Sequence, residues 1–230
     1  MAPFGKIYSY PGHFRVHRAQ VVAALNGLEV IEAPDFQMAV TNKTPEYLAK
    51  FPMGKVPALE CADGFCLAEG GAICQYLAAA GPRAAQLLGP AGDIKTQARI
   101  AEWVFFAETE LVSNLLPLIV MCLMKLLPYD EGRCNQHLAS AERAFGKVEH
   151  ALTTNATAGE KTRYLMGGPE ITLADVMVTG ALIPLFTSFI GAEMRAKIPN
   201  TVAYVQDLAA TKEFLDAFGP LKMCETGVRG

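Results

Sequence analysis

The sequence predicts an α+β protein in which a small N-terminal β-α-β-α-β-β-α domain is followed by an all-helical domain. Two observations carry this prediction. Short β-prone runs alternate with helical runs over the first 80 residues, and beyond residue 93 only helical periods remain. The 230 residues are 51% apolar and 19% charged, so the chain can bury a large core and does not have the composition of a disordered protein.

The first half of the small domain begins with a strand. Residues 6–10 are β-prone and end at Pro11-Gly12, and residues 15–25 have a helical period that ends at Asn26-Gly27. Residues 28–33 then alternate in polarity as a strand does. The predicted order up to this point is strand, helix, strand.

The second half supplies a short helix, a hairpin and a final helix. Pro45 begins the short helix as a first-turn proline, after an irregular loop. Residues 56–60 and 65–67 are short strands, and the Asp63-Gly64 turn between them is typical of a hairpin. The last helix of this domain covers residues 71–80 and ends at Gly81-Pro82.

The pattern changes after residues 82–93, which contain two prolines and two glycines and are predicted to link the domains. We therefore expect a first domain over residues 1–81 and an all-α domain over residues 94–230. The second domain begins with a long helix, in which Pro117 predicts a kink. A second helix carries an apolar stripe that includes Phe145 and Val148, and a polar loop is expected over 155–163.

The most apolar helix of the chain is predicted to begin at a capping box, Thr172 with Asp175. Its uncharged stretch, residues 176–192, is shorter than the about 20 residues that span a bilayer. Residues 115–124 are also apolar, and they are shorter still. We therefore expect a buried core helix and no membrane partner.

Charge and termini restrict the function classes further. The net charge is −3, with 20 Lys and Arg against 23 Asp and Glu, so no nucleic-acid partner is expected. The N-terminus has no apolar stretch and no small-residue cleavage site, so we expect no signal peptide and a cytoplasmic location. Six cysteines without a C-x-x-C pair are expected to be reduced, with a Cys61–Cys66 disulfide as the alternative.

Several short motifs can carry chemistry. A proline at the start of a strand, as in Val56-Pro57, fits a cis peptide that exposes the backbone of Val56 to a peptide-like ligand, or a simple edge proline. Glu69 precedes a helix whose N-terminus can bind a carboxylate, and it can equally be a cap. Lys43 and Lys55 flank the second helix and can bind a second carboxylate or lie in solvent.

The histidines do not indicate a metal site. His13 and His17 are four residues apart at the start of the first helix, a spacing that matches half of a metal site. No carboxylate or cysteine follows at a ligand spacing, so we expect no metal.

The combination of these motifs resembles the cytosolic glutathione transferase superfamily. The similarity covers essentially the whole chain and rests on residues 55–59 (KVPAL), 67–73 (LAEGGAI) and 171–175 (ITLAD). It implies a thioredoxin-like N-terminal domain followed by a helical transferase domain, usually in a homodimer.

Within this superfamily, the chain is most similar to the transferase-like N-terminal domain of the elongation factor 1B gamma subunit. This resemblance rests on residues 8–11 (YSYP), 50–57 (KFPMGKVP) and 103–107 (WVFFA). Stand-alone fungal glutathione transferases of natural-product pathways can resemble that domain too.

The resemblance implies six glutathione-binding residues. The backbone of Val56 pairs with the cysteinyl part, next to a cis-proline, and the glycyl and γ-glutamyl ends are held by side chains and by a helix N-terminus. The six positions are Lys43, Lys55, Val56, Pro57, Glu69 and Gly70. Gly70 stands where the family usually has serine, so it offers an N–H group and no hydroxyl.

The catalytic group is the main departure from the family. Theta-like transferases place a catalytic serine at the start of the first helix, where this chain has Gly12-His13-Phe14-Arg15. Tyr8, His13 and Arg15 are the candidates for lowering the pKa of the glutathione thiol, with Ser9 and Tyr10 as further alternatives. The second substrate is expected between the thiol and the helical domain, where the candidate walls are Phe14, Phe105, Leu115, Met121 and Met124. Each of these is otherwise an ordinary core residue.

The expected function is that of a glutathione transferase. It would use glutathione as co-substrate and add it to a hydrophobic, electrophilic small molecule, or isomerise that molecule reversibly, in a biosynthetic pathway. The alternative is a non-catalytic scaffold domain that holds translation-factor subunits. The gamma subunit continues into a charged linker and a further domain, which are absent from these 230 residues, so we expect the enzyme.

Overall fold

The computed structural model describes residues 3–157 and 164–229. The predicted α+β fold and the β-α-β-α-β-β-α order of its first part are confirmed. In chain order these elements are β1 (Gly5–Tyr8), α1 (Phe14–Leu25), β2 (Val30–Glu32), α2 (Pro45–Lys50), β3 (Ala58–Cys61), β4 (Cys66–Ala68) and α3 (Gly70–Ala79). A 3-10 turn, Thr41–Lys43, precedes α2.

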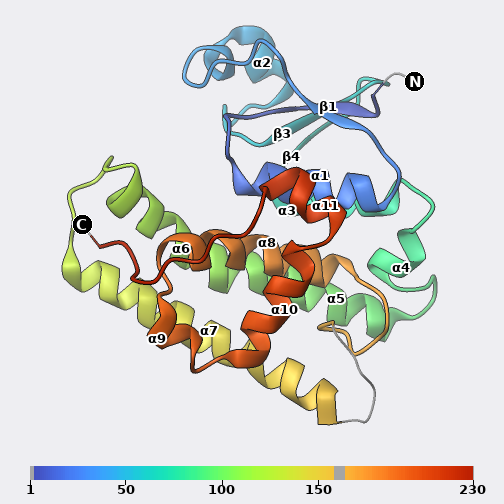
Figure 1. Ribbon diagram of the computed structural model, residues 1–230. Helices are drawn as coiled ribbons and strands as arrows, with labels where there is room; N and C mark the ends of the chain where they lie inside the picture. The colour runs from blue at the N-terminus through green and yellow to red at the C-terminus, as the bar shows by residue number, and fades with distance from the viewer. Residues whose placement is uncertain (1–2, 158–163, 230) are drawn as a thin grey trace.

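The four strands form one mixed sheet in the order β2-β1-β3-β4. β1 is parallel to β2 and antiparallel to β3, and β3 and β4 form the predicted hairpin. α1 and α3 cover the face toward the helical domain, whereas α2 covers the opposite face (Figure 1). Successive residues of a strand point to opposite faces. Ile7 is accordingly buried in the main core, while Tyr8 packs with Tyr47 and Phe51 on the α2 side.

The remaining helices lie below the sheet in Figure 1. They are α5 (Ile94–Phe106), α6 (Ser113–Leu118), α7 (Glu131–Thr157), α8 (Leu173–Ser188), α9 (Ala192–Arg195), α10 (Pro199–Ala209) and α11 (Lys212–Phe218). Two π-helical segments, η2 (Ala107–Val112) and η3 (Ile119–Leu123), continue α5 and α6. α11 returns to the first domain and packs against α1.

Two expectations about loops need correction, and one short helix was missed. The predicted linker contains a short helix, α4 (Ala84–Leu88), which Gly89 ends with a positive φ. α9 was not predicted, because four residues are too few to show a helical period. A polar loop was expected over 155–163, but residues 155–157 still belong to α7, and residues 158–163 lie outside the described residues.

The helical run Ile94–Leu123 passes through Pro117. Proline lacks the N–H that a regular helix needs, and the hydrogen bonding becomes π-helical directly after it, from Ile119. By length and composition alone this run could cross a membrane. Half of its most apolar 18-residue stretch, however, is buried inside the protein. Such burial is typical of a core helix.

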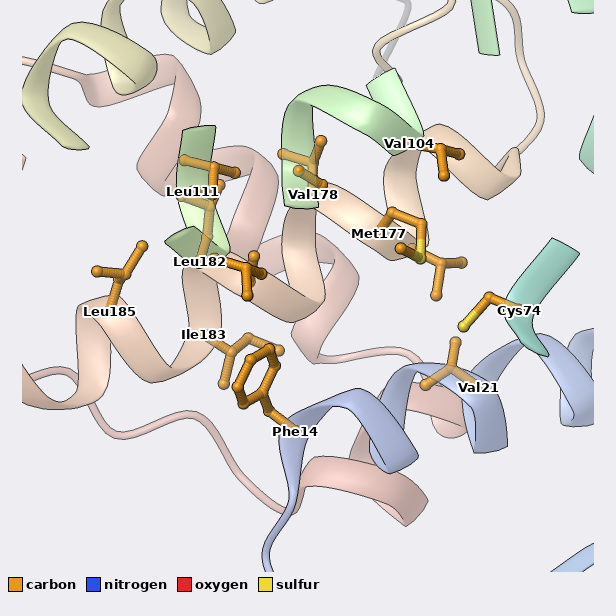
Figure 2. Packing of buried hydrophobic residues seen from close by; sticks show 14 of the residues in the cluster. Phe14, Val21, Cys74, Val104, Leu111, Met177, Val178, Leu182, Ile183 and Leu185 are labelled. Atoms are coloured by element: carbon orange, nitrogen blue, oxygen red, sulfur yellow. The ribbon is translucent and has the colours of Figure 1, made fainter. Parts of the chain in front are cut away.

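The two parts of the chain share one apolar core. In Figure 2, Phe14 and Val21 of α1 and Cys74 of α3 face Met177 and Ile183 of α8. α8 is buried along almost its whole length, as its uncharged sequence predicts. The first domain therefore rests on the helical domain through packed side chains, and this contact fixes how the two domains lie relative to each other.

The predicted capping box at the start of α8 is present. Asp175 Oδ2 accepts hydrogen bonds from the backbone N–H of Thr172 at 2.8 Å and from its hydroxyl at 2.9 Å. Asp175 Oδ1 accepts two more, from the N–H of Leu165 at 2.8 Å and the hydroxyl of Tyr204 at 2.9 Å. The carboxylate is fully buried and joins three segments of the helical domain.

The six cysteines are reduced, as expected, and the alternative Cys61–Cys66 disulfide is not formed.

Candidate functional site

The peptide bond between Val56 and Pro57 is cis. Ladder pairing of β3 begins only at Ala58. Within the described part of the chain, neither the N–H nor the C=O of Val56 pairs with another backbone group. Both groups are therefore available to an extended, peptide-like ligand, as in strand addition.

The strand register places the start of α3 beside this bond. Ala58 pairs with Ala68, so Pro57 lies next to Glu69 where the ladder ends. Glu69 has φ +70°, a sparsely populated conformation that costs roughly 1–3 kcal/mol and is often found at ligand sites. The first intrahelical bond of α3 runs from Ile73 N to Glu69 O, which leaves the N–H groups of the first turn unpaired within the helix.

A cavity of about 390 Å³ covers these groups. This volume lies in the range of small-molecule sites. Its lining combines the cis bond, the start of α3 and a wall from the helical domain: Arg15, Lys50, Phe51, Pro52, Met53, Lys55, Val56, Pro57, Ala68, Glu69, Gly70 and Leu116. Five of the six predicted glutathione-binding residues are thus brought together.

Of the two lysines predicted to bind glutathione, Lys55 and Lys43, only Lys55 lines the cavity. Lys55 is exposed and lines the pocket. Lys43, the sixth predicted residue, does not line it, although its Nζ lies 3.9 Å from the position a Cβ on Gly54 would take. Lys50 was not predicted. It lines the pocket and also forms an ion pair with Glu60 at 2.7 Å.

Tyr8 lies outside the pocket lining. Its hydroxyl donates to Glu60, a carboxylate that also pairs with Lys50 and Lys6. Burial, followed by the contact with Glu60, raises the pKa of Tyr8 to about 12. The hydrogen bonds from Lys50 and Tyr8 lower the pKa of Glu60 to about 2. Tyr8 is therefore protonated at neutral pH, and its hydroxyl proton is engaged in the hydrogen bond to Glu60 on the neighbouring strand β3.

His13 caps α1 in an extended conformation and is only 5% exposed. Its ring lies between Tyr10 and Phe14, with centroids at 4.6 and 5.8 Å, and its Nδ1 has no hydrogen-bond partner. Burial, with the nearby charges of Arg15 and Arg18, lowers the pKa of His13 to about 4. The imidazole is therefore neutral at pH 7. Of the three catalytic candidates, only Arg15 lines the pocket.

Sequence reasoning missed two residues of the charged cluster around Arg15, namely Glu108, which contacts Arg15 directly, and Arg18, which shares the same carboxylate. Glu108 of η2 accepts hydrogen bonds from Arg15 at 3.2 and 3.4 Å, and it forms an ion pair with Arg18. Arg18 is completely buried and also donates to the carbonyl of Met177 at 3.3 Å. Glu108 is 93 residues from Arg15 and 90 residues from Arg18 in the chain, so no local spacing could reveal these contacts.

The second-substrate candidates are scattered. Phe14 is buried and points toward Ile183 in the core (Figure 2), and Met121 is also buried. Leu115 is fully buried, while Phe105 and Met124 are 68% and 48% exposed. None of these lines the cavity among the described residues, and the wall from the helical domain is Leu116, a neighbour of one candidate. Their substrate role stays a prediction.

Comparisons with known proteins agree with this geometry. Residues 3–79 match the family described as "Glutathione S-transferase, N-terminal domain". The chain is 40% identical to the glutathione S-transferase-like protein LUC7 of Fusarium sp over 96% of this chain and 95% of that protein. It is also 38% identical to the glutathione S-transferase-like protein FUS3 of Gibberella moniliformis, over 98% and 97% of the two chains. The chain therefore belongs to the glutathione S-transferase-like family.

A second group of relatives consists of translation factors. The chain is 31% identical to elongation factor 1-gamma-A of Xenopus laevis over 96% of its own length, and it spans about half (48%) of that protein. Among solved structures, the GST-like domain of elongation factor 1-gamma from Saccharomyces cerevisiae has a TM-score of 0.79 at 24% identity, covering 99% and 98% of the two chains. The glutathione transferase URE2P6 from Phanerochaete chrysosporium, solved with oxidized glutathione, has a TM-score of 0.80 at 18% identity, covering 94% and 96%. The predicted fold is confirmed.

Proposed function

We propose that this protein binds glutathione in the cavity beside Pro57 and transfers it to an electrophilic small molecule. The observation that carries the proposal is the cavity itself, where the free backbone groups of Val56 lie next to the unpaired N–H groups at the start of α3. An extended tripeptide with a carboxylate at each end and one ammonium group matches this arrangement.

Each part of glutathione has a partner. The backbone of Val56 pairs with the cysteinyl residue. The start of α3 receives the γ-glutamyl carboxylate, and Glu69 receives its ammonium group, since helix N-termini favour anions. Lys50 and Arg15 also line the cavity, but each is paired with a glutamate, so Lys55, which precedes the cis bond, is the cation assigned to the glycyl carboxylate.

The chemistry requires a thiolate. A thiol with a pKa of about 8.5 is about 3% ionised at pH 7, and lowering this pKa by two units is worth about 2.7 kcal/mol. The N-terminus of α1 and the positive charge of Arg15 supply this stabilisation in place of the family serine. The thiolate then forms a C–S bond with the electrophilic carbon of a conjugated alkene. The alkene electrons move to the electron-withdrawing group, and the thiol proton, released to water, is replaced at the adjacent carbon.

The same addition can run backwards after the carbon–carbon bond has rotated. In that case the alkene is isomerised and glutathione is regenerated. The apolar wall at Leu116 favours a hydrophobic substrate for either reaction. We also propose that the protein forms a homodimer and acts in the cytoplasm.

Calorimetry with glutathione, followed by conjugation of 1-chloro-2,4-dinitrobenzene, tests the proposal. We expect measurable binding and turnover. Lys55→Met should weaken glutathione binding about tenfold, because a charged hydrogen bond is lost. Lys95→Met, an exposed lysine of α5 outside the cavity, is the matched control and should bind as the natural protein does.

Absence of both heat and turnover would instead favour the scaffold function. The relatives among the elongation factor 1-gamma proteins support that second candidate, as does the missing hydroxyl at Gly70. Size-exclusion chromatography with translation-factor subunits would then detect the complex.

A further inference from the structure

We propose that Cys122 and Cys134 are a redox-sensitive pair, which forms an intramolecular disulfide when the protein reacts with a small disulfide such as glutathione disulfide. Cys122 lies in η3 and Cys134 lies in the first turn of α7, and both are free thiols in the structure. The disulfide would tie these two helical segments together. The inference goes beyond the proposed function and holds whether or not the protein is a transferase.

The chain brings the two cysteines together by reversing its direction. α6 packs along α7, where Asn114 Oδ1 lies 3.1 Å from His137 Nδ1, and the chain turns back between these helices at the left of Figure 1. η3 continues α6 toward this turn, and α7 begins directly after it. Cys122 and Cys134 therefore face each other at the closed end of a helical hairpin.

The two thiols lie in contact within the core. Cys122 is 3% exposed and Cys134 is completely buried. The side chains hydrogen-bond to each other, and burial together with the neighbouring Cys134 raises the pKa of the Cys122 thiol. The side chain of Tyr129, from the turn between them, is hydrogen-bonded to Cys134. A disulfide forms only where two cysteines face each other at short range, and this pair meets that condition.

Cys61 and Cys66 are closer in the chain, yet they are not arranged for a disulfide. Cys66 is paired with Glu60 across the β3–β4 ladder, so Cys61, the next residue, points to the opposite face of the sheet from Cys66. The Cys61 thiol contacts the hydroxyl of Tyr76 at 3.9 Å, and the Cys66 thiol contacts the carbonyl of Gly64 at 3.5 Å. This pair serves as the internal comparison.

The segment that covers Cys122 and Cys134 is held by little buried surface. Lys125 within it has φ +53°, a conformation that is unfavourable for a residue other than glycine. Segments with few buried apolar contacts open locally at a small cost in free energy. A small disulfide can therefore reach thiols that are buried in the closed form. The large apolar side chains that this segment exposes are Leu123, Met124, Leu126, Leu127 and Tyr129.

The reaction consists of two thiol–disulfide exchanges. The Cys122 thiolate attacks one sulfur of glutathione disulfide, which forms a mixed disulfide and releases one glutathione. The Cys134 thiolate then attacks the Cys122 sulfur, which forms the intramolecular bond and releases the second glutathione. The protein loses two electrons and two protons, and the two glutathione molecules receive them. The positive charge of Arg229 opposes the effect of burial on the pKa of Cys122, so Cys122 is assigned as the attacking group.

Thiol counting and peptide mapping test the proposal. The natural protein is incubated with glutathione disulfide under native conditions, quenched with acid, and alkylated with N-ethylmaleimide after unfolding. We expect four alkylated cysteines instead of six, and no bound glutathione. Trypsin cleaves after Lys125 and Arg133, so the two cysteines fall on separate peptides, 100–125 and 134–143. The disulfide should link these two peptides.

Thermal unfolding measures the effect of the bond. The disulfide closes a short loop of the unfolded chain, so it should raise the Tm by about 5–10 °C. Dithiothreitol should restore six thiols and the original Tm. Cys122→Ser should show no cross-link and no shift, whereas Cys66→Ser, which removes a thiol outside the pair, should form the bond as the natural protein does. Peptide mapping of the natural protein decides the question even if Cys122→Ser does not fold.

Three results would overturn the assignment. Six alkylated cysteines after incubation would show that the pair is inert. A glutathione adduct on either cysteine without a cross-link would show that the second exchange does not occur. Cross-linked peptides with an unchanged Tm would show that the bond does not restrain the hairpin. None of these measurements uses glutathione binding or transferase activity, so their failure and the failure of the proposed function are distinguishable.

Discussion

Because Gly180 on α8 has no side chain, the aliphatic part of Arg18, which extends from α1, can lie directly against it. A Cβ on Gly180 would lie 2.6 Å from Arg18 Cδ and 3.3 Å from Phe218 Cζ. Arg18 is completely buried and pairs with Glu108, so this close approach joins the two domains and the charged cluster beside the cavity. A glycine within a helix is ordinarily a cost to stability, and here it is the condition for placing a buried arginine.

Gly180→Ala should therefore be strongly destabilising. The methyl group displaces Arg18, and overpacking together with a broken buried ion pair costs about 3 kcal/mol in the free energy of unfolding. Urea denaturation measures this loss. Gly146→Ala on α7 is the control, because a Cβ there meets nothing within 4 Å, and it should stabilise the protein by about 0.5–1 kcal/mol. Equal effects of the two substitutions would contradict this explanation.

Asp175→Asn tests the buried capping box. The carboxylate accepts four hydrogen bonds, and an amide can accept at only one of its two positions. Because the site is fully buried, the unpaired donors should lower the free energy of unfolding by at least about 3 kcal/mol. Asp93→Asn makes the same change at the exposed cap of α5, where the amide oxygen can still accept from the N–H of Thr96 and water can replace the other acceptor, so it should cost much less in the same thermal or urea unfolding experiment.

Tyr8→Phe separates a structural tyrosine from a catalytic one. The hydroxyl donates to Glu60 and does not line the cavity, so kcat/KM for conjugation should change by less than about twofold. The lost hydrogen bond to a partly exposed carboxylate should cost about 1 kcal/mol of stability. Steady-state kinetics and urea denaturation measure the two effects, and a tenfold fall in kcat/KM with unchanged stability would restore Tyr8 as a catalytic candidate.

His13 should remain neutral down to about pH 4. Its folded-state pKa is about 4, whereas the unfolded chain takes up the proton near 6.5. Folding stability that is present above pH 6.5 is consequently lost as the pH falls toward 4, by up to about 3 kcal/mol.

The imidazole resonance of His13, assigned by its absence in His13→Gln, measures this pKa in an NMR titration. The unfolding free energy of the same variant should decrease less between pH 6.5 and 4 than that of the natural protein. His150→Gln, an exposed histidine of α7, controls for the removal of a histidine. A His13 titration midpoint near 6.5 would show that the ring is not shielded from water.

Local patterns alone determined the order of elements in the first part of the chain, the hairpin, the capping box and the buried character of α8. These features depend on residues that are close in the chain, such as Asp63-Gly64 and Thr172 with Asp175, whose physical requirements can be read from spacing. The resemblance to glutathione transferases added the cis bond at Val56-Pro57 and five of the residues that line the cavity.

Only the tertiary structure decided which distant side chains meet. Phe14 and Phe105 are both aromatic residues on helices that contribute to the core, yet Phe14 is buried and Phe105 lies on the exposed side of α5. Tyr8 contacts Glu60 because a strand alternates its side chains between the two faces of a sheet. The contacts of Glu108 with Arg15 and Arg18 arise from packing one domain against the other. No spacing within either segment carries that information, since the partners come together only when the apolar faces of α1, α3 and α8 are buried together.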